Sequence, residues 1–151
     1  MPHIICEIAN GYYGNLKLSK KYIDIAAAAK SNAVKFQIAY PDDVLLKEDK
    51  IFKILKKNEM SLSQWKNLRN YAKNKKIKFY LDIDGEKAFK IAKKIKPDAL
   101  KISTTSFFDR KLLHNCLSSF NKIYISVSGI NEEEVHRLYL FLKSKKKLKK
   151  I

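Results

Sequence analysis

Five short apolar runs alternate with helical patterns along the chain, and this alternation restricts the possible folds more than any other feature. Each run has the length and the β-branched or aromatic content of a strand, and the runs cover residues 3–9, 33–39, 77–83, 98–103 and 122–128. Apolar residues at helical spacing predict helices over residues 16–30, 61–76, 86–95, 110–119 and 131–148, with a short helix over 49–57. Ser61 and Asn131 stand where N-caps are expected. The alternation predicts a parallel α/β sheet.

Two architectures accommodate five such units. One is a five-stranded, doubly wound open sheet, and the other is a partial TIM-type (β/α) barrel with about five parallel strand–helix units. A doubly wound sheet is covered by helices on both faces, so both faces of its strands should be apolar. A barrel instead lines its active-site mouth with polar side chains at the C-terminal ends of its strands.

Alternate residues of the five predicted strands separate into a polar face and an apolar face. Ile5, Glu7 and Ala9 share the polar face in the first strand, and the later strands add Lys35, Gln37, Tyr80, Asp82, Lys101, Ser103, Tyr124, Ser126 and Ser128. The opposite face is apolar, from Cys6 and Ile8 to Ile125 and Val127. Because one face carries polar groups on every strand, we favour the partial barrel over the open sheet.

Length and composition indicate one domain, residues 1–151, since 46% hydrophobic content is enough for a real core.

The formal net charge of +17 suggests an anionic partner, but only Arg69, Arg110 and Arg137 of the 32 basic residues are arginine. Arginine is the usual reader of bases and phosphates, so we do not expect dedicated nucleic-acid binding. The lysine-rich run at 143–150 is interpreted as a solvated helix end.

Compartment and metal signals are weak. No apolar stretch is long enough to span a membrane, and the first ten residues lack the pattern of an export signal. Cys6 and Cys116 are therefore expected to be reduced, partly buried thiols in a cytoplasmic protein. His3, His114 and His136 show no metal-like spacing, so we expect no metal ligands among them.

The polar face brings together residue types suited to an anionic ligand. Lys35 and Lys101 come from the second and fourth strands, while Glu7 and Asp82 come from the first and third. Hydroxyls are added by Ser103, Thr104, Ser126 and Ser128. Lysines attract a phosphate or carboxylate, hydroxyls donate hydrogen bonds, and carboxylates orient polar groups or move protons. Alternatively, Lys35–Glu7 and Lys101–Asp82 are ion pairs that hold the sheet together, but buried pairs are poor stabilisers, which favours a site.

Several motifs occur in the order seen in one enzyme family. The segment "CEIANGYYGNLKLSKKYIDIAAAAKSNAVKFQ" is followed by "SLSQWKNLRNYAKNKKIKF", "DALKIST" and "ISVSGINEEEV". Over residues 3–142 this series resembles the N-terminal part of the catalytic barrel of the sialic acid (N-acetylneuraminate) synthases. The run K-F-Q after such a helix, with the K-I strand at the proper distance, is the most specific part of the resemblance.

The resemblance implies a (β/α)₈ barrel that condenses phosphoenolpyruvate with an N-acetylmannosamine-type sugar in surface polysaccharide biosynthesis, using a divalent Mn or Mg ion. It implies that Lys35 and Lys101, with Thr104, hold the phosphate and carboxylate of phosphoenolpyruvate. Gln37 would orient the ligand by hydrogen bonds, and Glu7 would be a catalytic residue near the sugar. Asp82, Ser103, Ser126 and Ser128 complete the expected substrate-binding set.

The sequence also departs from the family pattern. Gly11 and Tyr12 stand where the family usually has Asn-His, and Asp82 stands where it has a phosphate-binding threonine. The family's metal-binding histidines come from later strands, so we expect this chain to encode no metal site and to be inactive alone. The expected partners are the two substrates and either a second copy or a complementing C-terminal half. The alternatives are a non-catalytic partner domain and a basic α/β protein that binds nucleic acid.

Overall fold

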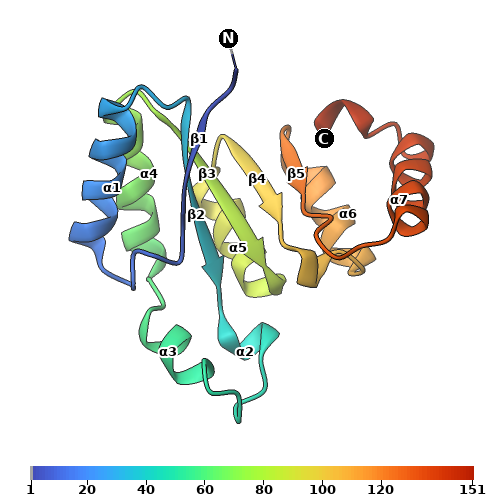
Figure 1. Cartoon of the computed structure of the whole chain (residues 1–151), viewed down its shortest axis with the longest axis horizontal. Coiled ribbons are helices and arrows are strands. Elements are labelled where there is room, and N and C mark those ends of the chain that lie inside the picture. The colour runs from blue at the N-terminus through green and yellow to red at the C-terminus, as the bar shows by residue number, and fades with distance from the viewer. Residues whose placement is uncertain (1) are drawn as a thin grey trace.

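Five strands form one parallel sheet in the computed structural model, which describes residues 2–151. The strands are β1 (Ile5–Ala9), β2 (Ala33–Ala39), β3 (Lys78–Asp84), β4 (Ala99–Ile102) and β5 (Ile123–Ile125). Their order in the sheet, β1-β2-β3-β4-β5, is their order in the sequence (Figure 1).

This sequential order distinguishes between the two predicted architectures. Parallel crossovers are right-handed, so successive steps in one direction leave every helix on the same face of the sheet. A doubly wound sheet instead reverses direction at a switch point and places helices on both faces. The partial TIM-type barrel is therefore confirmed, and the open doubly wound sheet is wrong.

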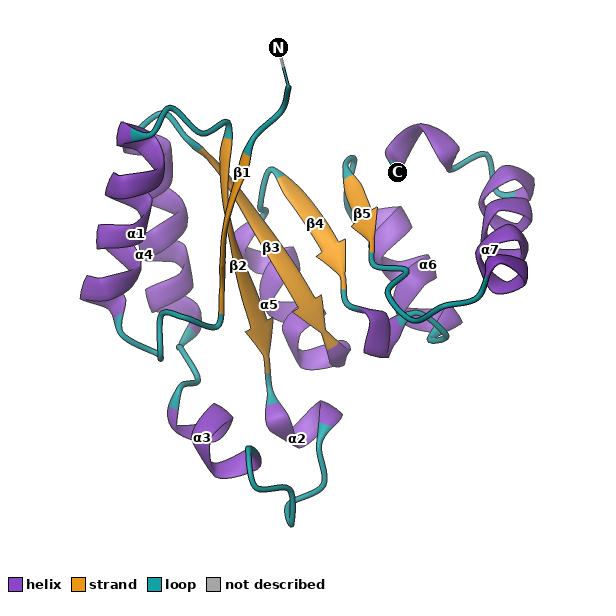
Figure 2. Cartoon of the chain, in the orientation of Figure 1, coloured by secondary structure: helices purple, strands orange, loops and turns teal. Residues whose placement is uncertain are grey.

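Helices follow the strands much as the sequence predicts (Figure 2). The longer ones are α1 (Leu16–Ala28), α4 (Leu62–Asn74), α5 (Gly85–Ile95), α6 (Arg110–Ser119) and α7 (Glu132–Ser144). Ser61 caps α4 in a reciprocal capping box with Gln64, and the Asn131 side chain accepts a hydrogen bond from the backbone N–H of Glu134 at the start of α7. None of these helices, nor any other helix within residues 2–151, is long and apolar enough to cross a membrane.

The apolar faces of the strands and helices form one continuous core. Val34, Phe36, Phe79, Leu81 and Leu100 are fully buried in it. Helix residues from α1, α4, α5, α6 and α7 pack against them, and Trp65 of α4 is the largest. Cys116 is buried in this core, which raises its pKa to about 12, and both it and Cys6 are free thiols. The polar side of the sheet is opposite this core.

Two strand-end predictions are wrong. Ala9 does not continue the polar face of Glu7, because a bulge pairs Glu7 with Lys35 and Ala9 with Phe36, and Ala9 has a φ of 49°. Val127 does not belong to the apolar face, because β5 ends at Ile125 and Val127 is exposed. Both errors have one cause: strict alternation holds only while a strand stays regular.

The C-terminal lysine run is also different from the prediction. Helix α7 ends at Ser144, and a short 3₁₀ turn, η2 (Leu148–Lys150), follows. Leu148 packs on the core, and the Lys150 ammonium donates to the carbonyl oxygens of Leu117 and Phe120, each at 2.9 Å. This part of the run is therefore docked on the C-terminal end of α6, where unpaired carbonyls favour a cation.

Between β2 and α4 the chain makes an excursion beyond the C-terminal end of β2. It contains α2 (Pro41–Val44) and α3 (Phe52–Lys57); the sequence predicted a helix over 49–57 but not α2. Asp43 of this excursion accepts a hydrogen bond from the backbone N–H of Lys87 at 2.5 Å and so caps α5 from a distance. Gly85, the first residue of α5, has a φ of 83°, and a Cβ there would lie 2.9 Å from the Asp43 Cβ.

We expect Gly85→Ala to destabilise the fold by about 2–4 kcal/mol, because left-handed strain adds to a clash with Asp43. Gly129→Ala is the matched control: its φ is 71°, but nothing lies within 4 Å of an added Cβ. The control should cost only about 1 kcal/mol. Urea unfolding of both variants measures the difference, and equal losses would show that the close approach of Asp43 does not matter.

Candidate functional site

Four charged side chains form a line across the polar face, from β1 to β4. Glu7 pairs with Lys35, and Asp82 pairs with Lys101. The two pairs are joined because the Lys35 Nζ lies 3.8 Å from the Asp82 Oδ2. Ser103 completes the group by donating from its hydroxyl to the Asp82 Oδ1 at 2.8 Å. The structure therefore brings together five of the nine predicted site residues in one contiguous polar cluster.

The middle of this line is buried and its ends are open. The side chains of Lys35 and Asp82 are 10% and 6% exposed, whereas those of Glu7 and Lys101 are 48% and 28% exposed. Desolvated charges interact more strongly than exposed ones, so the contacts of Asp82 should dominate the electrostatics of the cluster. Both predicted ion pairs exist, and an anion entering the site would meet lysines that already have partners.

The remaining predicted residues lie close to the cluster or beyond it. The Thr104 hydroxyl donates to the Ser126 hydroxyl at 2.7 Å, linking the ends of β4 and β5. Gln37 of β2 accepts a hydrogen bond from the Asn10 amide at 3.2 Å. Ser128 lies past the end of β5, is exposed, and makes none of the hydrogen bonds found within residues 2–151. The structure does not join Ser128 to the other site residues.

Two residues that the sequence did not predict as part of the site position Gln37. Asn10 fixes its side chain, and the Tyr12 hydroxyl donates to its carbonyl oxygen at 3.1 Å. Burial raises the pKa of Tyr12, so it remains a protonated donor. The sequence showed that both residues follow the first strand and that Tyr12 departs from the family pattern. It did not show the contact with Gln37, because that contact depends on how the loop after β1 folds back over β2.

Asp84 was also left out of the predicted site. It is 8% exposed, and its Oδ1 accepts hydrogen bonds from Thr105 at 2.6 Å and Ser106 at 2.9 Å. Ser106 in turn accepts a hydrogen bond from the Gly85 backbone N–H at 3.3 Å. Asp84 is next to α5 in sequence but makes no capping bond to it. Instead it ties the end of β3 to the 3₁₀ turn η1 (Thr104–Ser106).

The other end of the polar face is mainly aromatic and apolar. Tyr80 packs with Ala33 and Ala99, and its hydroxyl lies 3.0 Å from the His3 Nε2. Burial raises the pKa of Tyr80, although the nearby Lys122 cation opposes this effect. Lys35 is in register with Tyr80, whereas Asp82 and Lys101 lie one polar-face position closer to the C-terminal ends of their strands, which is where (β/α) barrels carry their active sites.

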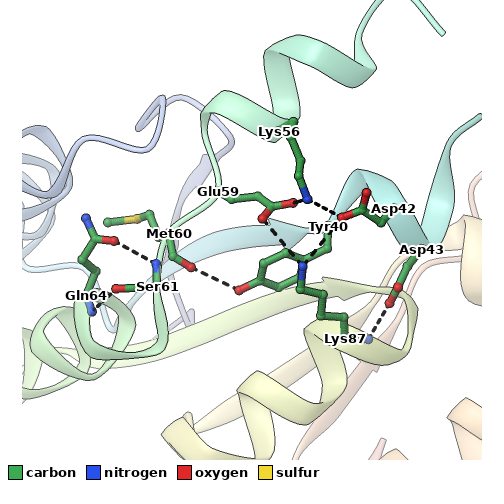
Figure 3. A network of polar contacts seen from close by, with 9 residues as sticks. All are labelled: Tyr40, Asp42, Asp43, Lys56, Glu59, Met60, Ser61, Gln64 and Lys87. Carbon is green, nitrogen blue, oxygen red and sulfur yellow. Dashed lines mark hydrogen bonds and ion pairs between the residues drawn. The ribbon is translucent and has the colours of Figure 1, made fainter. Parts of the chain in front are cut away.

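A second polar network fastens the 41–60 excursion to α5 beside this end of the sheet (Figure 3). Lys56 contacts Asp42 and Glu59, and the Lys87 ammonium lies 3.8 Å from Asp42 and 3.7 Å from Glu59. The hydrogen bond from Lys56 lowers the pKa of Asp42, so the pair persists at neutral pH and is lost only in acid, below the ordinary range of an aspartate. The Lys87 ammonium also lies 4.2 Å from the centre of the Tyr40 ring.

Comparison with known proteins identifies the family. Residues 22–150 match the NeuB family. The chain belongs to the NeuB family.

Two solved structures show the same relationship. The NeuB-family chain is 25% identical to the N-acetylneuraminic acid (sialic acid) synthetase of Leptospira borgpetersenii, solved in complex with citrate, with a TM-score of 0.88. It is also 25% identical to a spore coat polysaccharide biosynthesis protein of Bacillus subtilis, with a TM-score of 0.77. These matches cover 95% and 93% of the chain but only 50% and 40% of those proteins. No curated protein matches the sequence.

The metal that the resemblance implies does not fit the residues of this NeuB-family chain. Within residues 2–151, no three His, Cys, Asp or Glu side chains are grouped so that they could hold a metal ion. Glu7, Asp82 and Asp84 are engaged with lysines or hydroxyls.

Lys87→Met should loosen the 41–60 excursion, because it removes the cation that Asp42, Glu59 and the Tyr40 ring share. Amide hydrogen exchange in residues 41–60 is expected to accelerate about two- to fivefold, as for an exposed ionic network. Lys90→Met on the same helix is the control, because within residues 2–151 Lys90 makes one ion pair, with Glu86 at 3.8 Å. Equal exchange in the two variants would contradict a fastening role for Lys87.

Proposed function

We propose that this chain supplies the phosphoenolpyruvate-binding wall of a sialic acid synthase-type enzyme, which condenses phosphoenolpyruvate with an N-acetylmannosamine-type sugar. The observation that carries the proposal is the pair of lysines, Lys35 of β2 and Lys101 of β4, held on one polar face and joined through Asp82. The similarity to the Leptospira sialic acid synthetase supports this reading.

In this proposal each polar residue has a distinct role in binding or catalysis. Lys35 and Lys101 attract the phosphate and carboxylate, and the hydroxyls of Thr104 and Ser126 donate to them. Gln37, held by Asn10 and Tyr12, orients the ligand. Glu7 is half exposed at the edge strand, so it can leave Lys35 and move a proton at the sugar. Ser103 and Ser128 are the remaining candidate donors of the substrate-binding set.

The complete reaction needs groups beyond these residues. A Mn or Mg ion would have to be held by other side chains, and strands β1 and β5 each have one edge without a neighbouring strand within residues 2–151. Unpaired edges of a parallel sheet suit further parallel strands, so we include a complementing polypeptide among the partners. The similarity to a spore coat polysaccharide protein supports a role in surface polysaccharide biosynthesis, which we place in the cytoplasm.

Phosphoenolpyruvate binding tests the proposal directly. Isothermal titration of Lys35→Ala and of Lys101→Ala should show affinity at least about tenfold below that of the unmodified chain, since a charged contact is lost. Lys66→Ala, at an exposed position of α4, should bind as the unmodified chain does. The titrations are repeated with Mn²⁺ and with any complementing polypeptide present.

A non-catalytic role makes the opposite prediction. If the lysines only hold the sheet together, Lys35→Ala lowers the free energy of unfolding without changing phosphoenolpyruvate affinity. Absence of binding in every mixture would overturn the proposed function.

A further inference from the structure

We propose that Asp82 is a built-in occupant of the site between Lys35 and Lys101, and that an incoming anion must displace its carboxylate. This inference rests on the proposed function in taking the lysine pair as the anion site. It adds that one residue of this chain, Asp82, limits how tightly the site binds an anion and which anions it binds. The ligand class is a compact phosphate- or carboxylate-bearing anion.

The register of the sheet creates this arrangement. Strand β3 lies between β2 and β4, and Asp82 is in direct register with Lys101. The same oxygen, Oδ2, pairs with the Lys101 ammonium and lies 3.8 Å from the Lys35 ammonium. An external anion that contacts both ammonium groups needs the space that this oxygen occupies.

The burial of Asp82 makes its competition effective. Its side chain is 6% exposed, so little water screens its attraction to the two lysines. Glu7, Lys35, Asp82 and Lys101 together carry no net charge, although the whole chain carries +17. The charges of this cluster therefore balance, in spite of the positive charge of the whole chain. An incoming anion gains the attraction of the lysines only to the extent that it replaces Asp82 as their partner.

Neither of the other two carboxylates on this face can play the same part. Glu7 is half exposed and lies on the edge strand; of the two lysines it contacts Lys35, and it also accepts a hydrogen bond from the Ala9 backbone N–H at 3.0 Å. Asp84 contacts hydroxyls and neither lysine. Asp82 is held in place by Ser103, and asparagine at this position keeps an oxygen to accept that hydrogen bond while losing the charge. Asp82→Asn therefore isolates the electrostatic competition.

The test compares Asp82→Asn with Asp84→Asn in titrations with inorganic phosphate and with phosphoenolpyruvate, after circular dichroism has shown that each variant is folded. Asp82→Asn should bind both anions about 10- to 100-fold more tightly than the unmodified chain, because a charged contact no longer competes. Asp84→Asn should change either affinity less than about twofold. A folded Asp82→Asn protein with unchanged affinities would overturn the inference.

A measurement on the unmodified chain covers the case in which Asp82→Asn does not fold. During a phosphate titration, the ¹³C carboxyl resonance of Asp82 should shift as its lysine partners are taken, while that of Asp84 stays in place. A resonance of Asp82 that does not move at saturating phosphate would overturn displacement.

The outcomes for the two proposals are separable. If Asp82→Asn gains affinity for phosphate and neither it nor the unmodified chain binds phosphoenolpyruvate, the inference stands and the proposed substrate fails. If the unmodified chain binds phosphoenolpyruvate and Asp82→Asn binds neither anion more tightly, the proposed function stands and the inference fails.

Discussion

Parallel pairing of consecutive strands is the constraint on which the rest of this structure depends. Because each crossover steps to the next strand in the same direction, the crossover helices α1, α4, α5 and α6 pack on one face, and the opposite face carries the polar side chains. The same pairing brings Glu7, Lys35, Asp82 and Lys101 within reach of one another although they are spread over 95 residues of sequence, from 7 to 101. The site is a product of sheet register more than of any local motif.

Charge balance is the second consequence of this register. A lysine on a buried strand is costly unless it is paired, and here each of the two lysines is paired with a carboxylate from a neighbouring strand. The pairing stabilises the charges in the absence of a ligand, and it also reduces the attraction that a ligand anion would feel. The polar face of this NeuB-family chain therefore combines lysines suited to an anion with a carboxylate, Asp82, that already neutralises them.

Much of the fold followed from hydrophobic periodicity. The strand positions, the longer helices and the division into a polar and an apolar face were predictable because each rests on spacing within one segment. Irregular backbone was not predictable: the bulge at Ala9, the early end of β5 and the short helix α2 depend on contacts with distant residues. The cap on α5 shows this most clearly, since Asp84 is next to the helix but Asp43, from the excursion after β2, supplies the bond.

The sequence by itself determined which residue types face the polar side, which family the chain resembles and which ion pairs were possible, because alternation and motif order are local properties of the chain. Only the tertiary structure decided that the two ion pairs merge through Asp82, that Asn10 and Tyr12 hold Gln37, and that Ser128 lies outside the cluster. It also decided that the middle of the line is buried and its ends are open. The physical reason is that distances between strands, and the exclusion of water between side chains, exist only once the sheet has formed.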